Sequence, residues 1–191
     1  MRIITGSARG AKLITLEGEA TRPTAERTKE AIFSMIQFDI EGRKVLDLFA
    51  GSGQLALEAL SRGAAEAVMC DSSKEAAEVI RKNATKTRLS DKVNLHVCDS
   101  LKLIPKLGTE KFDLVFLDPP YAKDMKAEIL KKLTRANILN DGAIVVCETN
   151  VDFCAEDETV YNLTFKKKYR YGKVFVTMFT YHELSEESEN E

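Results

Sequence analysis

Residues 44–63 read KVLDLFAGSGQLALEALSRG. The apolar run at the start of this stretch predicts a buried strand, and the following apolar segment predicts a helix that ends at Gly63. Gly51 and Gly53 allow the chain to turn sharply between the two elements and to approach a ligand closely. The N-terminus of the helix offers free N–H groups to an anionic ligand. This strand–turn–helix unit therefore predicts an α/β fold with a ligand at the glycine turn.

The glycine turn differs from the motifs of dinucleotide- and triphosphate-binding proteins. Ala56 stands where Gly-x-Gly-x-x-Gly requires its third glycine, and no Gly-Lys-Ser/Thr sequence follows the turn. The missing glycine disfavours a dehydrogenase. A nucleoside that carries a carboxylate fits the turn better, and S-adenosylmethionine is such a molecule.

A second motif, FDLVFLDPPY, occupies residues 112–121. Its apolar run predicts a buried parallel strand, which two prolines end because they have no N–H to donate. The Asp118 carboxylate and the Pro119 carbonyl then form two acceptors beside the ring of Tyr121, at the strand end where α/β sheets bind ligands. Such a pair suits the exocyclic amine of a nucleobase stacked on Tyr121. A proline-rich turn without a binding role is the alternative for this motif alone.

Strand-like and helix-like segments alternate after residue 44, which predicts a parallel sheet with helices on both faces. Residues 2–5 and 12–16 predict an N-terminal β-hairpin, and Thr24 is expected to cap a helix that reaches Phe38. The expected strands are 44–49, 66–71, 93–98, 113–118 and 143–148, followed by an antiparallel hairpin of 159–166 and 173–181. The other expected helices lie near 53–62, 74–88, 100–107 and 124–136.

The two motifs together resemble those of S-adenosylmethionine-dependent amino-methyltransferases, and almost the whole chain resembles the RsmD family. The wider resemblance rests on Arg2 to Gly6, Arg9-Gly10, Arg22-Pro23-Thr24, Arg27, Glu30 to Phe33, Leu46 to Gly53 and Leu57 to Ala64. The family consists of bacterial enzymes that methylate the N2 amine of one guanine in 16S ribosomal RNA. The chain departs mildly from the family pattern at Thr5, Glu26, Gln54, Ala56 and Asp71.

This resemblance implies a Rossmann-like, seven-stranded methyltransferase fold with a mostly parallel sheet and a C-terminal antiparallel hairpin. The implied catalytic residues, which hold the guanine, are Asp118, Pro119, Pro120 and Tyr121. The implied site for S-adenosylmethionine, whose product is S-adenosylhomocysteine, comprises Asp47, Phe49, Gly51, Gly53, Asp71, Ser72, Asp99, Ser100 and Asp118. In this site Asp71 is placed to accept hydrogen bonds from ribose hydroxyls and Asp99 to accept one from the adenine amine.

The formal net charge of −2 hides two clusters of basic residues, one near the N-terminus and one at residues 166–173. Clustered Lys and Arg are typical of nucleic-acid binding, although either cluster alone could be a solvated face. The expected RNA-binding residues are Arg2, Arg9, Arg22, Thr24, Arg27, Lys168 and Arg170. We expect the N-terminal cluster to lie beside the mouth formed by Gly51 and Asp118, because a guanine that enters this mouth brings its backbone along. Which cluster dominates stays open.

The length of 191 residues indicates one methyltransferase domain over residues 1–182. Within it, residues 1–40 are expected to be an RNA-contacting extension and residues 41–182 the cofactor-binding core, whereas the acidic residues 183–191 are expected to be a disordered tail. Four cysteines without Cys-x-x-Cys spacing and only two histidines disfavour a metal site. No membrane span or signal peptide is evident. We therefore expect a monomeric cytoplasmic enzyme whose partner is ribosomal RNA or the assembled small subunit.

Two alternatives stay open. An amino-methyltransferase that acts on adenine or guanine of another RNA or of DNA would use the same chemistry, but a DNA enzyme needs a target-recognition domain for which this chain has no room. A non-catalytic ribosome-assembly factor would be marked by a degraded glycine turn or a lost Asp-Pro-Pro-Tyr, and both motifs are intact.

Overall fold

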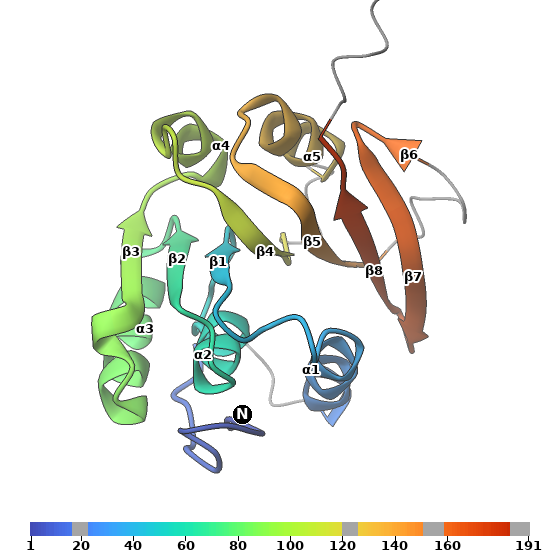
Figure 1. Cartoon of the computed structure of the whole chain (residues 1–191). Helices are drawn as coiled ribbons and strands as arrows, with labels where there is room; N and C mark the ends of the chain where they lie inside the picture. The colour runs from blue at the N-terminus through green and yellow to red at the C-terminus, as the bar shows by residue number, and fades with distance from the viewer. Residues whose placement is uncertain (17–22, 120–125, 151–158, 184–191) are drawn as a thin grey trace, which may run out of the picture.

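The structure is a computed structural model that describes residues 1–16, 23–119, 126–150 and 159–183. Its centre is a sheet with the strand order β3-β2-β1-β4-β5-β8-β7-β6 (Figure 1). The strands are β1 (Lys44–Asp47), β2 (Glu66–Asp71), β3 (Val93–Val97), β4 (Phe112–Leu117), β5 (Leu139–Thr149), β6 (Thr159–Val160), β7 (Leu163–Tyr171) and β8 (Val174–Tyr181). Seven of them form the expected methyltransferase sheet, and the two-residue β6 extends it at the edge beside β7.

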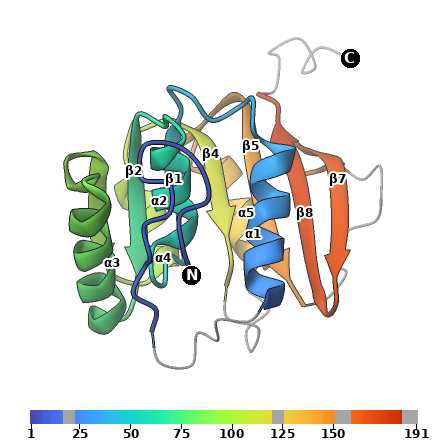
Figure 2. The same ribbon diagram turned by 90° about the horizontal axis from the view of Figure 1, so that it is seen from below.

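Strands β1 to β5 are parallel, so their carboxyl ends lie at one edge of the sheet, which we call the carboxyl edge. Strand β8 runs antiparallel to β5, and Thr149 at the end of β5 pairs with Phe175 at the start of β8. The turn between β7 and β8 therefore returns to the carboxyl edge. The arrowheads of β2, β4 and β7 accordingly point the same way in Figure 2. The chain order reverses between β1 and β4, where open α/β sheets bind ligands.

Helices cover both faces of the sheet, as expected from the alternating pattern (Figure 1). One face carries α1 (Pro23–Met35), α2 (Gln54–Ser61) and α3 (Lys74–Thr87), and the other carries α4 (Ser100–Leu103) and α5 (Lys126–Arg135). Short 3-10 turns, η1 (Ser90–Lys92) and η2 (Ile104–Lys106), complete the described elements. The strands β1 and β4 are almost wholly buried because they lie between two helical layers.

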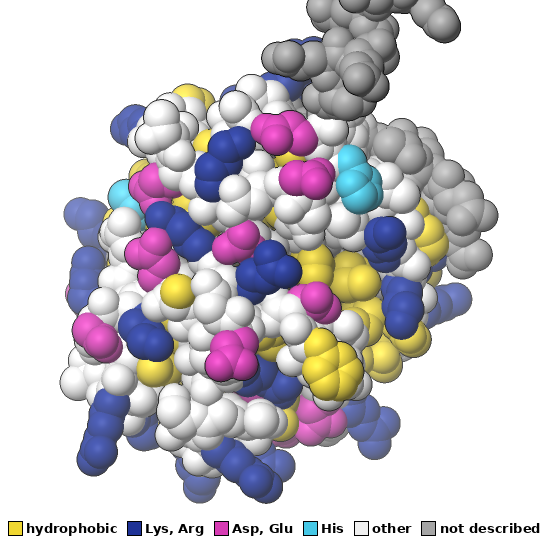
Figure 3. All heavy atoms as spheres, in the orientation of Figure 1, with side chains coloured by type: hydrophobic (Ala, Val, Ile, Leu, Met, Phe, Trp, Pro, Cys, Tyr) yellow, Lys and Arg dark blue, Asp and Glu magenta, His cyan; other side chains and the backbone are white. Residues whose placement is uncertain are grey.

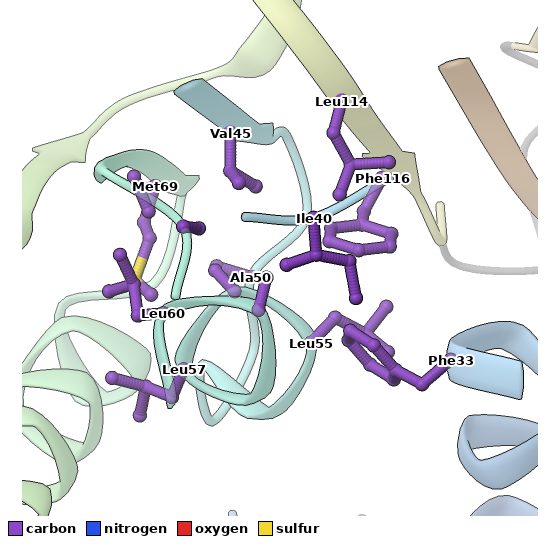
Figure 4. Close-up of a cluster of buried hydrophobic side chains, with 14 of the residues drawn as sticks. Phe33, Ile40, Val45, Ala50, Leu55, Leu57, Leu60, Met69, Leu114 and Phe116 are labelled. Carbon is purple, nitrogen blue, oxygen red and sulfur yellow. The ribbon is translucent and has the colours of Figure 1, made fainter. Parts of the chain in front are cut away.

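Helix α2 is the centre of one hydrophobic core. Its residues Leu57 and Leu60 are fully buried and belong to a cluster that also includes side chains of β1 and β4 (Figure 4). The ring of Phe33 on α1 lies 5.8 Å from the ring of Phe116 on β4, measured between centroids. This contact joins α1 to β4 and so holds the N-terminal helix against the sheet.

The ends of several elements differ from the sequence-based expectation. Helix α1 begins at Pro23, so Thr24 lies in its first turn and is not the capping residue; proline favours the first helical position because its φ is already helical. The helix ends at Met35, short of Phe38, which is exposed. The expected N-terminal hairpin contains a single β-bridge, between Arg2 and Lys12.

Strand β7 continues through the basic residues that were expected to form the hairpin loop. A register shift between Phe165 and Lys167 adds one residue to this strand, as a β-bulge does, and pairing then resumes as far as Tyr171. The basic cluster at residues 166–173 is therefore largely part of the sheet, and the turn itself is reduced to Gly172 and Lys173.

Candidate functional site

The glycine turn lies at the carboxyl edge, between β2 and β4. The amide of Leu48 donates to the Phe116 carbonyl at 3.3 Å, and the amide of Ala50 donates to the Cys70 carbonyl at 2.9 Å. Gly53 has a φ of +79°, and a Cβ added there would lie 3.3 Å from Cγ1 of Ile80. Glycine is thus required at this position both by the left-handed backbone and by the close packing of α3.

Asp71, the last residue of β2, holds the glycine turn in place. One carboxylate oxygen accepts a hydrogen bond from the Gly51 amide at 2.9 Å, and the other accepts one from the Ser73 amide at 2.8 Å. A carboxylate has about four acceptor positions, so each oxygen can still accept a hydrogen bond from a ligand hydroxyl. Asp71 can therefore both shape the turn and bind a ribose.

Asp47 ends β1 beneath this turn and is 1% exposed. Its Oδ1 accepts a hydrogen bond from the Phe49 amide at 3.4 Å. Burial raises the pKa of Asp47 to about 7, because the charged form loses its hydration; the Phe49 amide opposes the shift and the charge of Asp71 adds to it. Asp47 is thus a buried residue that supports the turn from beneath.

Asp99 and Ser100 follow the end of β3. Asp99 is exposed and caps α4, where its side chain accepts a hydrogen bond from the Lys102 amide at 3.2 Å. Ser100 is buried directly after it, and Ser72 is exposed between Asp71 and α3. The structure therefore brings the expected cofactor residues together along the carboxyl edges of three adjacent strands, from β1 to β3.

Asp118 and Pro119 follow β4, which pairs with β1 on the other side of the chain reversal. The residue paired with Asp47 is Phe116, so Asp118 lies two residues beyond it, at the mouth of the site. Asp118 is half-buried and Pro119 is buried. Pro120 and Tyr121 lie outside the described residues.

The expected RNA-binding residues are spread over the molecule. Arg2 is exposed and forms an ion pair with Glu26, with Nε 3.1 Å from Oε1, and Arg27 is exposed on α1. Lys168 is half-buried on β7, whereas Arg170 is exposed, donates from Nε to the Gly172 carbonyl at 3.0 Å and lies over the Phe175 ring. Arg22 and the side chain of Thr24 lie outside the described residues.

The expectation that Arg9 lies beside the mouth is wrong. The loop that contains Arg9 packs on Ser61, the last residue of α2: the Ser7 amide donates to the Ser61 carbonyl at 2.8 Å, and the Ala8 amide donates to its hydroxyl at 3.0 Å. Gly51 lies at the other end of this helix, about 12 Å away at 1.5 Å per residue. Loop position depends on such long-range contacts, which the charge pattern does not encode.

Sequence reasoning missed a buried cluster of charges that attaches the N-terminal segment to α2. Glu58 is fully buried and accepts hydrogen bonds from the amides of Ile4 and Thr5 at 2.7 and 3.0 Å. Its oxygens also lie 3.4 Å from Nζ of buried Lys29 and 2.9 Å from Nε of Arg62. Burial lowers the pKa of Lys29, and Glu58 opposes that shift. The available signal was a single acid within the otherwise apolar helix LALEAL.

Asn83 on α3 makes a second connection between the N-terminal segment and the glycine turn. Its Nδ2 donates to the carbonyls of Ile14 and Ser52 at 2.9 and 2.8 Å, and its Oδ1 accepts from the Ile14 amide at 2.8 Å. Its polar atoms are thus used in structural hydrogen bonds, which supports a structural role for this buried side chain.

The described cysteines are free thiols. Sγ of Cys70 lies 3.9 Å from Sγ of Cys98, and burial raises the pKa of Cys70. Among the described residues, no group of three or more His, Cys, Asp or Glu side chains could hold a metal ion. Within the same part of the chain, no helix is long and apolar enough to cross a membrane.

A family model, curated protein sequences and solved structures were compared with this chain, and all three show similarity over most of its length. A family model described as "Conserved hypothetical protein 95" matches residues 1–180. The Haemophilus influenzae protein named "Ribosomal RNA small subunit methyltransferase D" is 36% identical over 156 residues, which cover 80% of each chain. Its Escherichia coli K12 counterpart of the same name is 33% identical over 154 residues, or 80% of this chain and 76% of that protein. The solved structure of YhhF from Escherichia coli is 27% identical, with a TM-score of 0.84, over 96% of this chain and 99% of that one.

Proposed function

The chain belongs to the family whose model matches residues 1–180, the RsmD family, and from its site we propose that it transfers a methyl group from S-adenosylmethionine to the N2 amine of a guanine in 16S ribosomal RNA. One observation supports this proposal most strongly: the two sequence motifs lie next to each other where the strand order reverses between β1 and β4. The glycine turn after β1 and the acceptor pair Asp118 and Pro119 after β4 lie at the ends of adjacent parallel strands. Cofactor and base can thus meet there.

The cofactor would lie across the carboxyl edge of β1, β2 and β3. Asp71 would accept hydrogen bonds from the ribose hydroxyls and Asp99 one from the adenine amine, whereas Ser72 and Ser100 flank these positions. The methionine end would approach the glycine turn, which Asp47 supports from beneath. The N-terminus of α2, where Gly53 provides no side-chain cap, suits the carboxylate of this molecule.

The guanine N2 atom is a poor nucleophile because its lone pair is delocalised into the ring. Hydrogen bonds from its two N–H groups to the Asp118 carboxylate and the Pro119 carbonyl would favour a more tetrahedral nitrogen that faces the methyl group. The new N–C bond forms as the C–S bond breaks, and the sulfonium becomes the thioether of S-adenosylhomocysteine. The alkylated amine is acidic, so Asp118 or water can receive its proton. Orientation and electrostatics supply the rate enhancement in this scheme.

Exposed basic residues of α1 and β7, Arg27 and Arg170 among them, would bind RNA phosphates. Tyr121 would stack on the target base. We propose that the protein acts in the cytoplasm as a monomer, either on free ribosomal RNA or on the assembled small subunit.

Replacement of Asp118 tests the proposed chemistry. Asp118→Ala should lower the rate of methyl transfer by roughly a hundredfold or more, since it removes an acceptor aimed at the reacting amine. Cofactor affinity should change little, because the proposed partner of Asp118 is the base. Single-turnover transfer of labelled methyl groups to transcribed 16S ribosomal RNA gives the rate, and calorimetry gives the affinity.

Asp91→Ala is the matched control, because Asp91 is an exposed acid in η1, at the amino end of β3. A wild-type rate in Asp118→Ala would remove Asp118 from the reaction. Mapping of the methylated nucleoside then decides the target atom: N2-methylguanine supports the proposal, and N6-methyladenine, or no product with the wild-type protein, refutes it.

A further inference from the structure

Strand β7 carries two tyrosines on one face, because side chains alternate along a strand and Tyr169 and Tyr171 are two residues apart. Their ring centroids lie 6.3 Å apart with an interplanar angle of 23°. Tyr171 packs against the hydrophobic core on the face that carries α1, whereas Tyr169 is 42% exposed. One ring is thus anchored in the core and the other presents apolar surface to solvent.

This tyrosine pair lies at the carboxyl edge of the sheet, as the proposed active site does. Tyr171 is the last residue of β7, and it pairs with Val174 at the start of β8. The start of β8 lies beside the carboxyl end of β5 (Figure 2). In the sheet order, β7 is three strands away from β4, or about 14 Å at about 4.8 Å per strand. A few nucleotides of single-stranded RNA can span that distance.

Basic side chains surround the pair. Lys167 lies on the same face as Tyr169, two residues before it, and both Lys166 and Lys167 are exposed. Lys173 is exposed in the turn that follows Tyr171, whereas Arg170 is exposed on the opposite face of the strand, over the Phe175 ring. Figure 3 shows hydrophobic side chains over the region of β7 and β8, with Lys and Arg side chains at the margin. The patch therefore combines apolar ring surface with positive charge, the combination that binds single-stranded nucleic acids.

We propose that the Tyr169–Tyr171 pair is a stacking site for an unpaired nucleobase of the RNA, a few nucleotides from the base that is methylated. This inference rests on the proposed function and adds a second base-binding site to it. A base would stack on the exposed ring of Tyr169, while Lys167 and Lys173 contact the adjoining phosphates. The charge of these side chains favours RNA over an apolar protein partner, and stacking on a ring does not require a particular base.

The test compares three tyrosine variants in binding to transcribed 16S ribosomal RNA. Tyr169→Ala should weaken binding roughly 5- to 150-fold, the range measured for loss of one base–aromatic stack. Tyr169→Phe should bind within about twofold of wild type, because it keeps the aromatic face. The matched control is Tyr161→Ala: Tyr161 is 41% exposed and precedes β7 at its other end, away from the carboxyl edge.

The salt dependence of binding separates stacking from phosphate contacts. The slope of log affinity against log salt should be unchanged in Tyr169→Ala, because no charge is lost, whereas Lys167→Ala should flatten it by about one unit. Affinity for S-adenosylhomocysteine should be unchanged in all variants, which also shows that each variant is folded.

Photocross-linking of the wild-type protein to 4-thiouridine-substituted RNA provides a test without substitution. A cross-link at Tyr169, located by mass spectrometry, supports the inference, and cross-links confined to other parts of the surface overturn it. Equal RNA affinities of Tyr169→Ala and Tyr161→Ala also overturn it, while methylation by the wild type leaves the proposed function intact. A wild-type protein that neither binds nor methylates the RNA refutes the proposed function itself.

Discussion

At the scale of single residues, Asp47 is an ionisable group placed where ionisation is costly. Its folded pKa of about 7 lies above the ordinary value of 3.8, so the folded state keeps a proton that the unfolded state releases. Its contribution to stability is therefore full below the ordinary pKa and is lost as the pH rises towards 7. The buried carboxylate thus destabilises the fold at neutral and alkaline pH.

The variant Asp47→Asn removes this titration. The free energy of unfolding of the variant, relative to wild type, should rise between about pH 5 and about pH 8, by on the order of a few kcal/mol. Urea unfolding at both pH values measures the change, with Asp91→Asn as the exposed control. A difference between variant and wild type that does not depend on pH would show that Asp47 titrates normally.

At the scale of elements, the attachment of the N-terminal segment to α2 depends on the absence of a side chain at Gly6. This residue has a φ of +89°, and a Cβ added there would lie 1.7 Å from the Ser61 carbonyl oxygen. Gly10 has a similar φ of +82°, but an added Cβ would meet nothing within 4 Å. The two glycines therefore share the backbone requirement and differ in packing.

Gly6→Ala should separate the segment from α2, because the clash is with backbone that cannot move freely. Gly10→Ala should cost only about 1–2 kcal/mol, the strain of a left-handed alanine. Hydrogen exchange at the amides of Ser7 and Ala8, which donate to Ser61, reports the attachment directly. Equal exchange rates in the two variants would show that contact with Ser61 does not hold the segment.

At the scale of the whole molecule, cofactor binding should stabilise the fold, because the proposed site joins the ends of separate strands. S-adenosylhomocysteine at a hundred times its Kd should add about 2.7 kcal/mol to the free energy of unfolding, and Tm should rise accordingly.

Asp71→Ala should weaken the affinity for S-adenosylhomocysteine by roughly 1–3 kcal/mol, the scale for loss of a buried hydrogen-bond partner. The same ligand concentration should then give a smaller Tm shift in this variant than in Asp91→Ala, and identical shifts would place the cofactor elsewhere.

Much of the fold was predictable because the sequence features that specify it act within short segments of the chain. The apolar runs at β1 and β4, the glycines after β1 and the prolines after β4 specify strand, turn and strand end through backbone chemistry alone. Parallel strands share one carboxyl edge, so the same local signals predicted that Asp47, Asp71 and Asp118 would lie there. The resemblance to RsmD enzymes, which also rested on N-terminal segments such as Arg22-Pro23-Thr24, was confirmed by the family match.

Only the tertiary structure decided which distant residues are neighbours. Lys29 and Glu58 lie on different helices, and nothing in the spacing of charges shows that they meet in the core. The loop that contains Arg9 lies at the far end of α2 because of its contacts with Ser61, which is likewise distant in the sequence. Pairing of β7 with β8 resumes after the bulge and continues as far as Tyr171, so Tyr169 and Tyr171 lie at the carboxyl edge. Such pairings depend on chain packing in three dimensions, whereas residue periodicity encodes only the element to which each residue belongs.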